Sequence, residues 1–584
     1  MIDLSRDELL TSFGKTTLHD RYLLPEETSP QEAFMRAAKA FSDNDEMAER
    51  IYNYSSKLWF MYATPILTNG GTNRGMPISC FLNYVPDSRE GLTGHYSENA
   101  WLASVGGGIG GYWGAVRSDG TATSHGSQSS GSIPFLHVVD SEMLAFSQGK
   151  TRRGSYAAYM DVSHPEILEF LDMRKPSGGD VHRKCLNLHH AVNLSNNFMT
   201  LIENCIKEPT FDDSWNLVDP HTNKIVRVVS ARELWQKILE NRVATGEPYI
   251  MFGDTVNESL PQSQKDLGLT VHHSNLCSEI TLPTDETRTA VCCLSSVNLE
   301  KYDEWKQDRM FIPDLIHFLD NVLQHFIDHA PDTLYRAKFS AVNERSLGLG
   351  AMGFHSYLQA NNIPFESALA KSKNLQMFKH IKEQATAESK RLAVKKGEAP
   401  DMEGTGMRNA HLLAIAPNAS SSIICGTTSP SIEPFRANAY VQKTMSGSFL
   451  VKNKHLEKLL ESKEMNTEET WKHILANRGS VLLLKGLSAY EKDIYKTAIE
   501  INQQWIVEHA ADRQQFICQS QSVNVFVPAD VHIKELHDIH MLAWKRKLKT
   551  LYYCRSEAIK RAELVSQKVE RTIIPEAECL SCEG

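Results

Sequence analysis

The sequence lacks the features of a membrane, secreted or nucleic-acid-binding protein. No stretch approaches the roughly eighteen apolar residues that span a bilayer, and the first eight residues form neither a basic nor an apolar leader. Eleven cysteines among 584 residues are too few for a disulfide scaffold. A net charge of −9 gives no positive field that would hold a nucleic-acid backbone. We therefore expect a cytoplasmic protein with free thiols and with neither a membrane nor a nucleic-acid partner.

What is present is typical of a large α/β protein, with 41% hydrophobic and 23% charged residues. Helical spacing of apolar residues from 30 to 59 predicts two helices separated near Ser42 to Asp45. From about 60 to 300, short apolar runs alternate with turn-rich and helical stretches, which favours βα units. Further helices are expected over 165–173, 231–240, 312–329 and 367–396, and helix-rich sequence over 455–515.

Three motifs imitate known binding sites. Gly106 to Gly111 fits G-x-G-x-x-G, but no acidic residue follows about twenty positions later at a strand end. Gly149-Lys-Thr lacks the first glycine of a P-loop. The neighbouring histidines at 189–190 and at 272–273 should point apart on a strand, which favours ordinary polar or core histidines. None of the three predicts a nucleotide or metal site.

The most specific signals are four cysteine contexts. Asn275, Cys277 and Glu279 are spaced by two, which predicts an amide, a thiol and a carboxylate on one face of a strand. Burying three such groups is costly unless each is satisfied, which favours a functional site. Cys579-Leu-Ser-Cys582 is a dithiol so close to the C-terminus that it can reach other parts of the protein. The alternative, half of a zinc site, would need a second pair of ligands. The remaining contexts are Pro77-Ile-Ser-Cys80 and Ala290-Val-Cys292-Cys293.

In this order, Ser274-Asn-Leu-Cys-Ser-Glu-Ile280, Cys292-Cys-Leu-Ser295, Lys549-Thr-Leu-Tyr-Tyr553 and the final Cys-x-x-Cys resemble the large (α, catalytic) subunit of ribonucleotide reductase. The resemblance extends from about Gly14 to the C-terminus. It implies an α/β fold, a ten-stranded α/β barrel made of two five-stranded half-barrels, with a helical N-terminal region. The implied domains are a helical region at 1–62, the catalytic barrel with its C-terminal helices at 63–573, and a flexible redox-active tail at 574–584.

The resemblance also implies roles for the first three site residues. Cys277 would carry the thiyl radical that abstracts the ribose 3′-hydrogen. Glu279 would accept the 3′-hydroxyl proton as a general base, which allows the 2′-hydroxyl to leave as water. Asn275 would hydrogen-bond the sugar.

A dithiol is implied to supply the reducing equivalents. Cys80 and Cys292 would form it, with Cys293 as a competitor for the second position. Cys579 and Cys582 would then reduce the resulting disulfide by thiol exchange, and a thioredoxin or glutaredoxin-like reductant would restore them.

The paired tyrosines Tyr552 and Tyr553 would be stacked relay residues that pass a radical equivalent to the cysteine. Two neighbouring tyrosines are more commonly strand filler, so their role depends on the resemblance. The radical would come from a ferritin-like β (small) subunit with a dimetal cofactor. No metal or other cofactor is expected in this chain.

Two nucleotide sites are implied. The substrate would contact two groups of residues: Thr64, Ser79 and Gly108, and the turn Pro417, Asn418, Ala419, Ser420 and Ser421. A nucleoside triphosphate effector would bind near Asp87, Ser88, Arg117 and Arg152, at the interface of a homodimer. A diphosphate is the expected substrate, with a triphosphate as the alternative.

We therefore expect the catalytic subunit of a class I ribonucleoside-diphosphate reductase, an enzyme that makes deoxyribonucleotides by thiyl-radical chemistry. The alternative is an adenosylcobalamin-dependent class II enzyme, which shares the five cysteines. A disulfide oxidoreductase or nucleotide-binding regulator is disfavoured by the intact Cys277, Glu279 and both dithiols. Only about fifteen residues precede the resembling part, so we expect no N-terminal ATP-cone and no shut-off by dATP through one.

Overall fold

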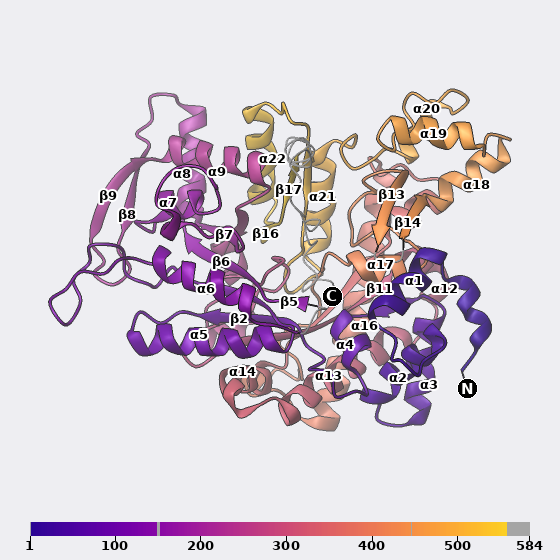
Figure 1. Ribbon diagram of the computed structural model, residues 1–584, viewed down its shortest axis with the longest axis horizontal. Coiled ribbons are helices and arrows are strands. Elements are labelled where there is room, and N and C mark those ends of the chain that lie inside the picture. The colour runs from indigo at the N-terminus through magenta and orange to yellow at the C-terminus, as the bar shows by residue number, and fades with distance from the viewer. Residues whose placement is uncertain (1, 149–151, 445–446, 557–584) are drawn as a thin grey trace.

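The computed structural model describes residues 2–148, 152–444 and 447–556 (Figure 1). Five parallel strands form one half of the central sheet, in the order β2, β3, β6, β7, β10. Helices connect successive strands of this half, as the alternating pattern predicted. The strands and their helices are β2 (Cys80–Tyr84), α5 (Arg89–Ser104), β3 (Gly108–Tyr112), α6 (Ile133–Ala145), β6 (Ser155–Asp161), α7 (Ile167–Asp172), β7 (His189–Leu194), α8 (Asn196–Lys207), α9 (Ala231–Thr245) and β10 (Tyr249–Phe252).

The second half runs antiparallel to the first at both seams. Strand β11 (Ala290–Asn298) pairs with β2, and β16 (Thr550–Leu551) pairs with β10. Between them, β12 (Leu347–Met352) lies parallel to β11, and two extended segments join in parallel through Leu349–Leu413 and Ile415–Gln521. The amide of Tyr552 donates to the carbonyl of Val523 at 2.8 Å and closes the ring. The predicted barrel of two five-stranded halves is thereby confirmed.

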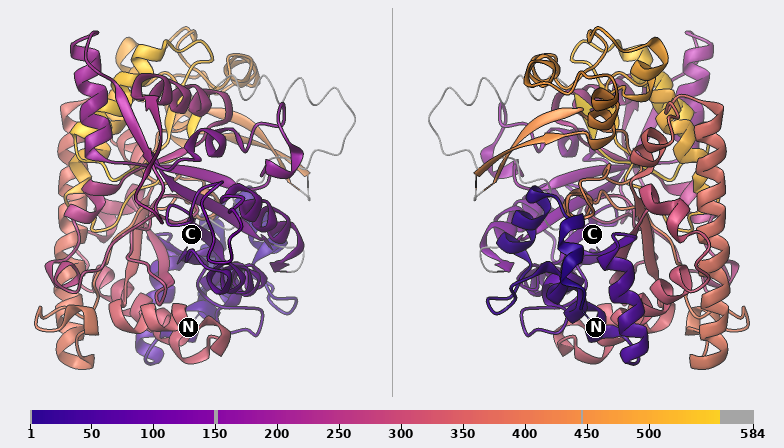
Figure 2. Two further views of the ribbon diagram at one scale, coloured as in Figure 1. Left: turned by 90° about the vertical axis from the view of Figure 1, so that its left-hand side faces the viewer. Right: turned by 90° about the vertical axis from the view of Figure 1, so that its right-hand side faces the viewer.

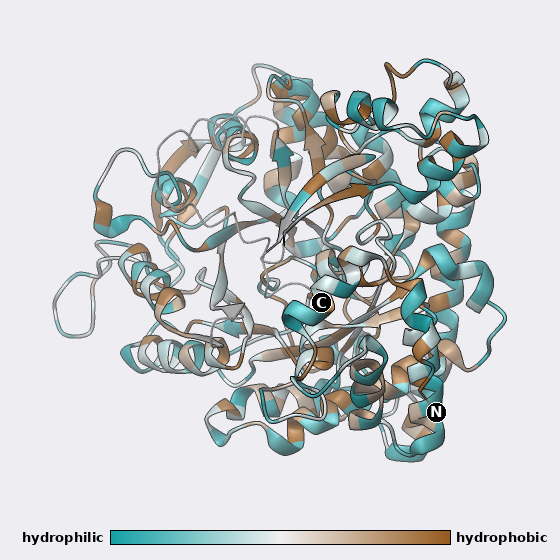
Figure 3. Cartoon of the chain, turned by 45° about the vertical axis from the view of Figure 1, so that its right-hand side comes forward, coloured by the Kyte–Doolittle hydropathy of each residue, from teal (hydrophilic) through white to brown (hydrophobic). Residues whose placement is uncertain are grey.

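An outer layer of helices covers the barrel. The long helix α16 runs along one side of the molecule (Figure 2), and the outer helices alternate hydrophilic and hydrophobic residues along their length (Figure 3). One apolar face of each can therefore pack inward. Besides the helices of the first half, the outer helices are α10 (Gly253–Glu258), α11 (Gln262–Asp266), α12 (Tyr302–Trp305), α13 (Phe311–His329), α14 (Tyr335–Glu344), α15 (Phe354–Ala360), α16 (Ala368–Lys396), α17 (Ala419–Ile424), α21 (Gln503–Gln514) and α22 (Ile533–Lys545).

The N-terminal region is helical, as predicted. Ser29 and Glu32 form a capping box at the start of α2, and Asn44 caps α3. The break between these helices is at the expected position. The elements are α1 (Ser12–Arg21), α2 (Pro30–Phe41), α3 (Asp45–Ser56), β1 (Phe60–Tyr62) and α4 (Thr64–Asn69), and β1 adds to β11 in antiparallel fashion.

Smaller pieces stand outside the barrel (Figure 1). A hairpin of β8 (Ser214–Val218) and β9 (Ile225–Ser230) lies at one end. At the other end, β13 (Ala439–Thr444), β14 (Gly447–Lys452), α18 (Lys454–Ser462), α19 (Glu468–Ala476) and α20 (Ala489–Ile494) enclose a small core of their own. Two short strand pairs remain: β4 (Ser147–Gln148) with β5 (Arg152–Arg153), and β15 (Val525–Val527) with β17 (Cys554–Ser556). Within the described residues, no helix is both long and apolar enough to cross a membrane.

The inside of the barrel holds residues 271–285, here named the finger loop. Its Leu276 and Cys277 pack against Tyr159 and Tyr552 in a cluster separate from the main core. The strand predicted for Asn275 to Glu279 is wrong, because this segment is a loop with a turn and Ser278 has a φ of 67°. Barrel side chains, instead of strand neighbours, satisfy its backbone.

Strand β3 must be rich in glycine to admit this loop. A Cβ on Gly110 would lie 2.1 Å from the carbonyl oxygen of Ser274, and one on Gly111 would lie 1.7 Å from the Tyr156 hydroxyl. Both distances are far inside van der Waals contact. The glycine run that imitates a dinucleotide motif therefore serves the close approach of the finger loop and of Tyr156.

Candidate active site in the barrel

Cys277 lies at the tip of the finger loop and is fully buried. Its sulfur is 3.2 Å from the Tyr552 hydroxyl on the facing strand segment. The loop is fixed through its carbonyl groups: Ser522 donates to Cys277 at 2.6 Å, Thr550 to Ser278 at 2.8 Å and Tyr159 to Asn275 at 2.6 Å. Three hydrogen bonds from three separate barrel strands thus hold the thiol at one position.

Asn275 and Glu279 flank the thiol, although they do not share a strand face. The side-chain oxygen of Asn275 accepts from the amide of Ile280 at 3.1 Å, which closes the loop, and its nitrogen lies 3.9 Å from the Cys80 sulfur. The carboxylate of Glu279 is fully buried and accepts from the Ser522 hydroxyl at 3.2 Å. The loop therefore brings together the three groups that the spacing singled out.

Cys80 and Cys292 lie directly opposite each other across the seam between β2 and β11. Burial raises the pKa of the Cys292 thiol well above its usual value, so the resting group is neutral. The amide nitrogen of Gln519 lies 3.5 Å from the Cys292 sulfur. The neighbouring Cys293 instead directs its sulfur to the carbonyl of Leu319 in α13, at 3.3 Å. This register favours Cys292 over Cys293 as the partner of Cys80.

Three tyrosines cluster beside the thiol. The ring centroids of Tyr552 and Tyr553 are 4.3 Å apart, and the rings are tilted by 51°, so they do not stack in parallel as expected. Tyr249 of β10 packs 4.7 Å from Tyr552 and 5.1 Å from Tyr553. The guanidinium of Arg555 lies 4.2 Å from the centre of the Tyr553 ring. The chain from half-buried Tyr553 through Tyr552 to Cys277 is therefore continuous.

A charged cluster lies beside this chain. His189 and His190 both bind the buried carboxylate of Glu247, through Nδ1 at 2.5 Å and 3.0 Å, and Arg174 pairs with it at 2.6 Å. As expected, the two histidines point to opposite faces of β7: the His189 ring packs against Tyr249, whereas the His190 ring packs against Phe170 of α7. Glu247 lies beyond the strand ends, where its two carboxylate oxygens reach both rings. Burial alone would raise the pKa of Glu247, but Arg174 and His189 hold it well below its usual value. The Tyr553 hydroxyl is 3.4 Å from His189.

The residues expected around the substrate lie along one side of the barrel. Gly108 pairs in register with Cys80, and the Ser79 carbonyl accepts from the Gly108 amide. Thr64 begins α4 and its hydroxyl is 3.0 Å from that of Tyr22. The turn before α17 has Asn418 in the left-handed region, with its amide donating to Ser296 of β11 at 2.8 Å. Pro417, Ala419, Ser420 and Ser421 complete that turn.

Three of the four residues expected around the effector lie together outside the barrel, at the start of α5. Ser88 caps this helix, and Asp87 forms an ion pair with Arg117 at 2.9 Å. The carboxylate and the guanidinium therefore bind each other here, whereas the sequence predicted that each would contact the nucleotide. His221, from the β8–β9 hairpin, adds a contact of 3.2 Å to Asp87. Arg152 lies in β5.

Comparisons with known proteins agree on one family. The model described as "Ribonucleotide reductase, barrel domain" matches residues 78–405 and 400–554, and "Ribonucleotide reductase, all-alpha domain" matches residues 8–75. This chain belongs to the ribonucleotide reductase large-subunit family.

Relatives of known identity span nearly the whole chain. It is 45% identical to the ribonucleoside-diphosphate reductase large subunit of Invertebrate iridescent virus 3, over all of both proteins. It is 30% identical to that of Vaccinia virus (strain Copenhagen), over all of this chain and 83% of the relative. Among solved structures, the Actinobacillus ureae class Id ribonucleotide reductase alpha subunit matches with a TM-score of 0.82 and 36% identity, over 94% of this chain and 97% of that one. The class I relative supports the main interpretation over the class II alternative.

Several residues of this ribonucleotide reductase site were missed by sequence reasoning. Gln519 and Ser522 contact the dithiol and the finger loop, and Tyr249 joins the two relay tyrosines. The uninterrupted polar run Gln519-Ser-Gln-Ser522 is the signal that could have indicated Gln519 and Ser522, because buried polar side chains need partners. His221 carried no such signal.

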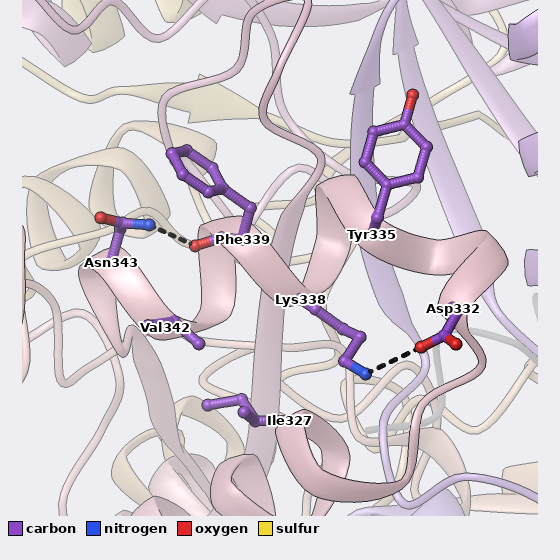
Figure 4. Close-up of a pocket in the computed structure, with 7 residues that line it drawn as sticks. All are labelled: Ile327, Asp332, Tyr335, Lys338, Phe339, Val342 and Asn343. Atoms are coloured by element: carbon purple, nitrogen blue, oxygen red, sulfur yellow. Dashed lines mark hydrogen bonds and ion pairs between the residues drawn. The ribbon is translucent and has the colours of Figure 1, made fainter.

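Some expected features remain outside this description. Cys579 and Cys582 lie beyond the described residues, so their role stays a prediction, as do the domain boundaries. In the described part of the chain, no group of three or more His, Cys, Asp or Glu side chains is arranged to hold a metal ion. A surface hollow of about 480 Å³ beside α14 contains none of the expected site residues (Figure 4); it is lined by Ile327, Asp332, Tyr335, Lys338, Phe339, Val342 and Asn343.

Proposed function

We propose that this chain is the catalytic subunit of a class I ribonucleoside-diphosphate reductase and that Cys277 is its radical-bearing residue. The single observation that carries the proposal is the 3.2 Å contact between the Cys277 sulfur and the Tyr552 hydroxyl, in a buried part of the barrel. Hydrogen-atom transfer between a thiol and a phenol requires this kind of direct contact. A water-excluded site also protects a radical from side reactions.

Tyr553 and Tyr552 carry the radical equivalent inward. Each phenol loses one electron and one proton and regains both when the next residue is oxidised. Tyr553 is half-buried, so it is the member through which an oxidant held by a separate small subunit would act. A dimetal cofactor in that subunit would supply the one-electron oxidation, and this chain would supply the path to the thiol.

At the substrate, the Cys277 thiyl radical takes the 3′-hydrogen atom, so that an S–H bond forms and a C–H bond breaks. Glu279 accepts the 3′-hydroxyl proton while the 2′-hydroxyl leaves as water. Cys80 and Cys292 provide two electrons and two protons and close to a disulfide. Cys277 finally returns the hydrogen atom to the 3′ carbon. The net reaction is ribonucleotide plus dithiol to deoxyribonucleotide, disulfide and water.

We assign the substrate to the side of the barrel bounded by Thr64, Ser79, Gly108 and the turn from Pro417 to Ser421. Hydroxyl groups and backbone amides at this turn suit a diphosphate. Asn275 would hold the sugar, because its side-chain nitrogen lies toward the Cys80 sulfur and therefore toward the reacting carbons. Cys579 and Cys582 would regenerate the dithiol with a thioredoxin or glutaredoxin-like protein.

We place the effector nucleoside triphosphate at Asp87, Ser88, Arg117 and Arg152, next to a homodimer interface. Helices α5 and α6 pack on each other and still expose large apolar side chains at Trp101, Val138, Leu144 and Phe146. A second copy of these helices would cover them. Effector binding would exchange the Asp87–Arg117 ion pair for contacts to ribose and phosphate.

The test is an assay of nucleoside diphosphate reduction by the purified chain with a metal-loaded small subunit, compared with the chain plus adenosylcobalamin alone. We expect product only with the small subunit. The control is Cys277→Ser, which should fold and bind nucleotide but give no product. Turnover with the cobalamin alone would refute the class I proposal, and appreciable turnover by Cys277→Ser would refute the radical assignment.

A further inference from the structure

Cys518 lies outside every site described above, one residue before Gln519. Because Gln519 directs its amide at Cys292, the preceding side chain faces the opposite side of this extended segment. There it meets the outer helix layer, and Lys382 of α16 is close enough to act on its charge. Cys518 is half-buried, whereas Cys425, a cysteine of the same protein with no proposed role, is fully buried.

The sulfur of Cys518 accepts two backbone hydrogen bonds from the neighbouring strand segment. The amides of Leu412 and Leu413 donate to it at 3.1 Å and 3.2 Å. A neutral thiol is a weak acceptor. Two converging N–H groups at these distances form the kind of cradle that stabilises an anion.

A histidine completes the cluster. His411 is only 1% exposed, and its Nε2 lies 3.2 Å from the side-chain oxygen of Gln264. Its Nδ1 is buried and has no hydrogen-bond partner among the described residues, and the imidazole lies near enough to Cys518 to lower the pKa of that thiol. An imidazole that is oriented by an amide oxygen and lies near a thiol is the arrangement that activates cysteine nucleophiles.

Positive charge surrounds this cluster. Burial raises the pKa of Cys518, but Lys382, His411 and the backbone amides outweigh burial and hold the pKa well below its usual value. Lys549 donates to the carbonyl groups of Cys518 and Gln519 at 2.6 Å and 2.9 Å. Burial lowers the pKa of Lys549 to about 8, against the opposing effect of Cys518.

We propose that Cys518 is an activated thiolate and a site of reversible oxidation by peroxides, separate from the cysteines of ribonucleotide reduction. The thiolate attacks one peroxide oxygen, so that an S–O bond forms, the O–O bond breaks and hydroxide leaves. The sulfur is oxidised by two electrons to the sulfenic acid. A thiol then converts this product to a mixed disulfide and water, and a second thiol restores Cys518.

Oxidation would be transmitted to the active site through Gln519. This residue contacts the Cys292 sulfur, donates to the carbonyl of Leu347 at 2.9 Å and accepts from the amide of Thr281 at 3.1 Å. The added oxygen and the lost charge would displace the Leu412 and Leu413 amides and shift this strand segment. Reduction of ribonucleotides should therefore fall on oxidation and recover with a dithiol; this consequence rests on the proposed function.

The alternative is that Cys518 is an ordinary neutral thiol. The carbonyl of Leu413 lies 3.7 Å from the sulfur and could accept its proton. The two descriptions differ in how the reaction of Cys518 depends on pH. A thiolate reacts at a constant rate between pH 6 and 9, whereas a thiol reacts about tenfold faster per pH unit up to its pKa near 8.5.

The test uses the full chain in a Cys579→Ser/Cys582→Ser background, in which the tail thiols cannot compete. Iodoacetamide labelling is followed peptide by peptide by mass spectrometry from pH 6 to 9, and a sulfenic-acid-trapping dione is used after peroxide treatment. We expect a constant alkylation rate and the main sulfenic label at Cys518, with Cys425 unlabelled. In His411→Phe, or in His411→Gln if the former does not fold, the rate should become pH-dependent.

A tenfold rise per pH unit in the parent chain, or no sulfenic label at Cys518, would overturn the proposal. These labelling results do not require catalysis, so they stand or fall separately from the proposed function. The link between oxidation of Cys518 and activity is tested in a separate experiment, with the chain that keeps its native tail. After peroxide, Cys518→Ser should retain at least about twice the fraction of activity that the unmodified chain retains, and equal losses would overturn the coupling through Gln519.

Discussion

Replacing Cys292 and Cys293 one at a time gives a matched test of the dithiol assignment. The two residues are neighbours on β11, both are buried, and each contributes one sulfur to a packed interior. Changing either to alanine removes about one methylene equivalent, so each should cost roughly 1 kcal/mol of stability. Stability alone therefore cannot separate them, and any large difference in activity must come from chemistry.

The geometry predicts that difference. Directly opposed residues on antiparallel strands have Cβ atoms about 4.5–5.5 Å apart, and a disulfide needs about 3.5–4.5 Å. Cys292 and Cys80 therefore need to approach by only about 1 Å. The Cys293 sulfur is directed to Leu319 on the opposite face of the strand, so no comparable movement can join it to Cys80.

The assay is thioredoxin-dependent reduction of a nucleoside diphosphate, supplemented by one turnover of the pre-reduced enzyme and mapping of disulfide-linked peptides. Cys292→Ala should form no product, because a single remaining thiol cannot supply two electrons. Cys293→Ala should keep most of the activity, and its mapped disulfide should join positions 80 and 292. The reasoning fails if a folded Cys293→Ala is inactive or if Cys292→Ala still turns over.

Two further predictions follow from packing and burial. Gly110→Ala should displace the finger loop, since its new Cβ would lie 2.1 Å from the Ser274 carbonyl. We expect a loss of about 1–3 kcal/mol in urea unfolding and a loss of turnover. The control for overpacking is Gly253→Ala, whose new Cβ would have its nearest neighbour at 3.9 Å, and normal turnover by Gly110→Ala would contradict the packing argument. Burial lowers the pKa of His95, His273 and His355 to about 3, so the unfolded chain binds more protons below its own pKa near 6.5. Stability from these groups is present above pH 6.5 and decreases as the pH falls toward 3, by about 1.4 kcal/mol per pH unit for each group. Urea midpoints at pH 7.5 and 5 measure this, and equal midpoints would rule out neutral buried histidines.

The features that the sequence predicted are those determined by residues close together in the chain. The helices at 30–41 and 45–56 were predicted from the spacing of their apolar residues, and in the structure a capping box and an Asn cap of neighbouring residues begin them. The cysteine contexts were likewise recognisable from short motifs. The half-barrels were implied by resemblance, and the strand register confirms them.

What could not be predicted depends on distant partners. The period-two spacing of Asn275, Cys277 and Glu279 suits a strand, but Ser522, Thr550 and Tyr159 hold these residues as a loop from more than a hundred positions away. Neighbouring residues give no information about such contacts. The shared binding of two histidines by Glu247 has the same cause, because the carboxylate comes from the start of another strand.

The position of the dithiol at the seam between half-barrels has a mechanical consequence. Cys80 belongs to the first half and Cys292 to the second, so oxidation ties the two halves covalently and reduction releases them. The bond would close a loop of about 210 residues, which removes about 5 kcal/mol of chain entropy from the unfolded state. Under the proposed mechanism, the protein therefore alternates in every catalytic cycle between a barrel whose halves are cross-linked by a disulfide and a barrel without that cross-link. The form that awaits reduction is the harder of the two to unfold.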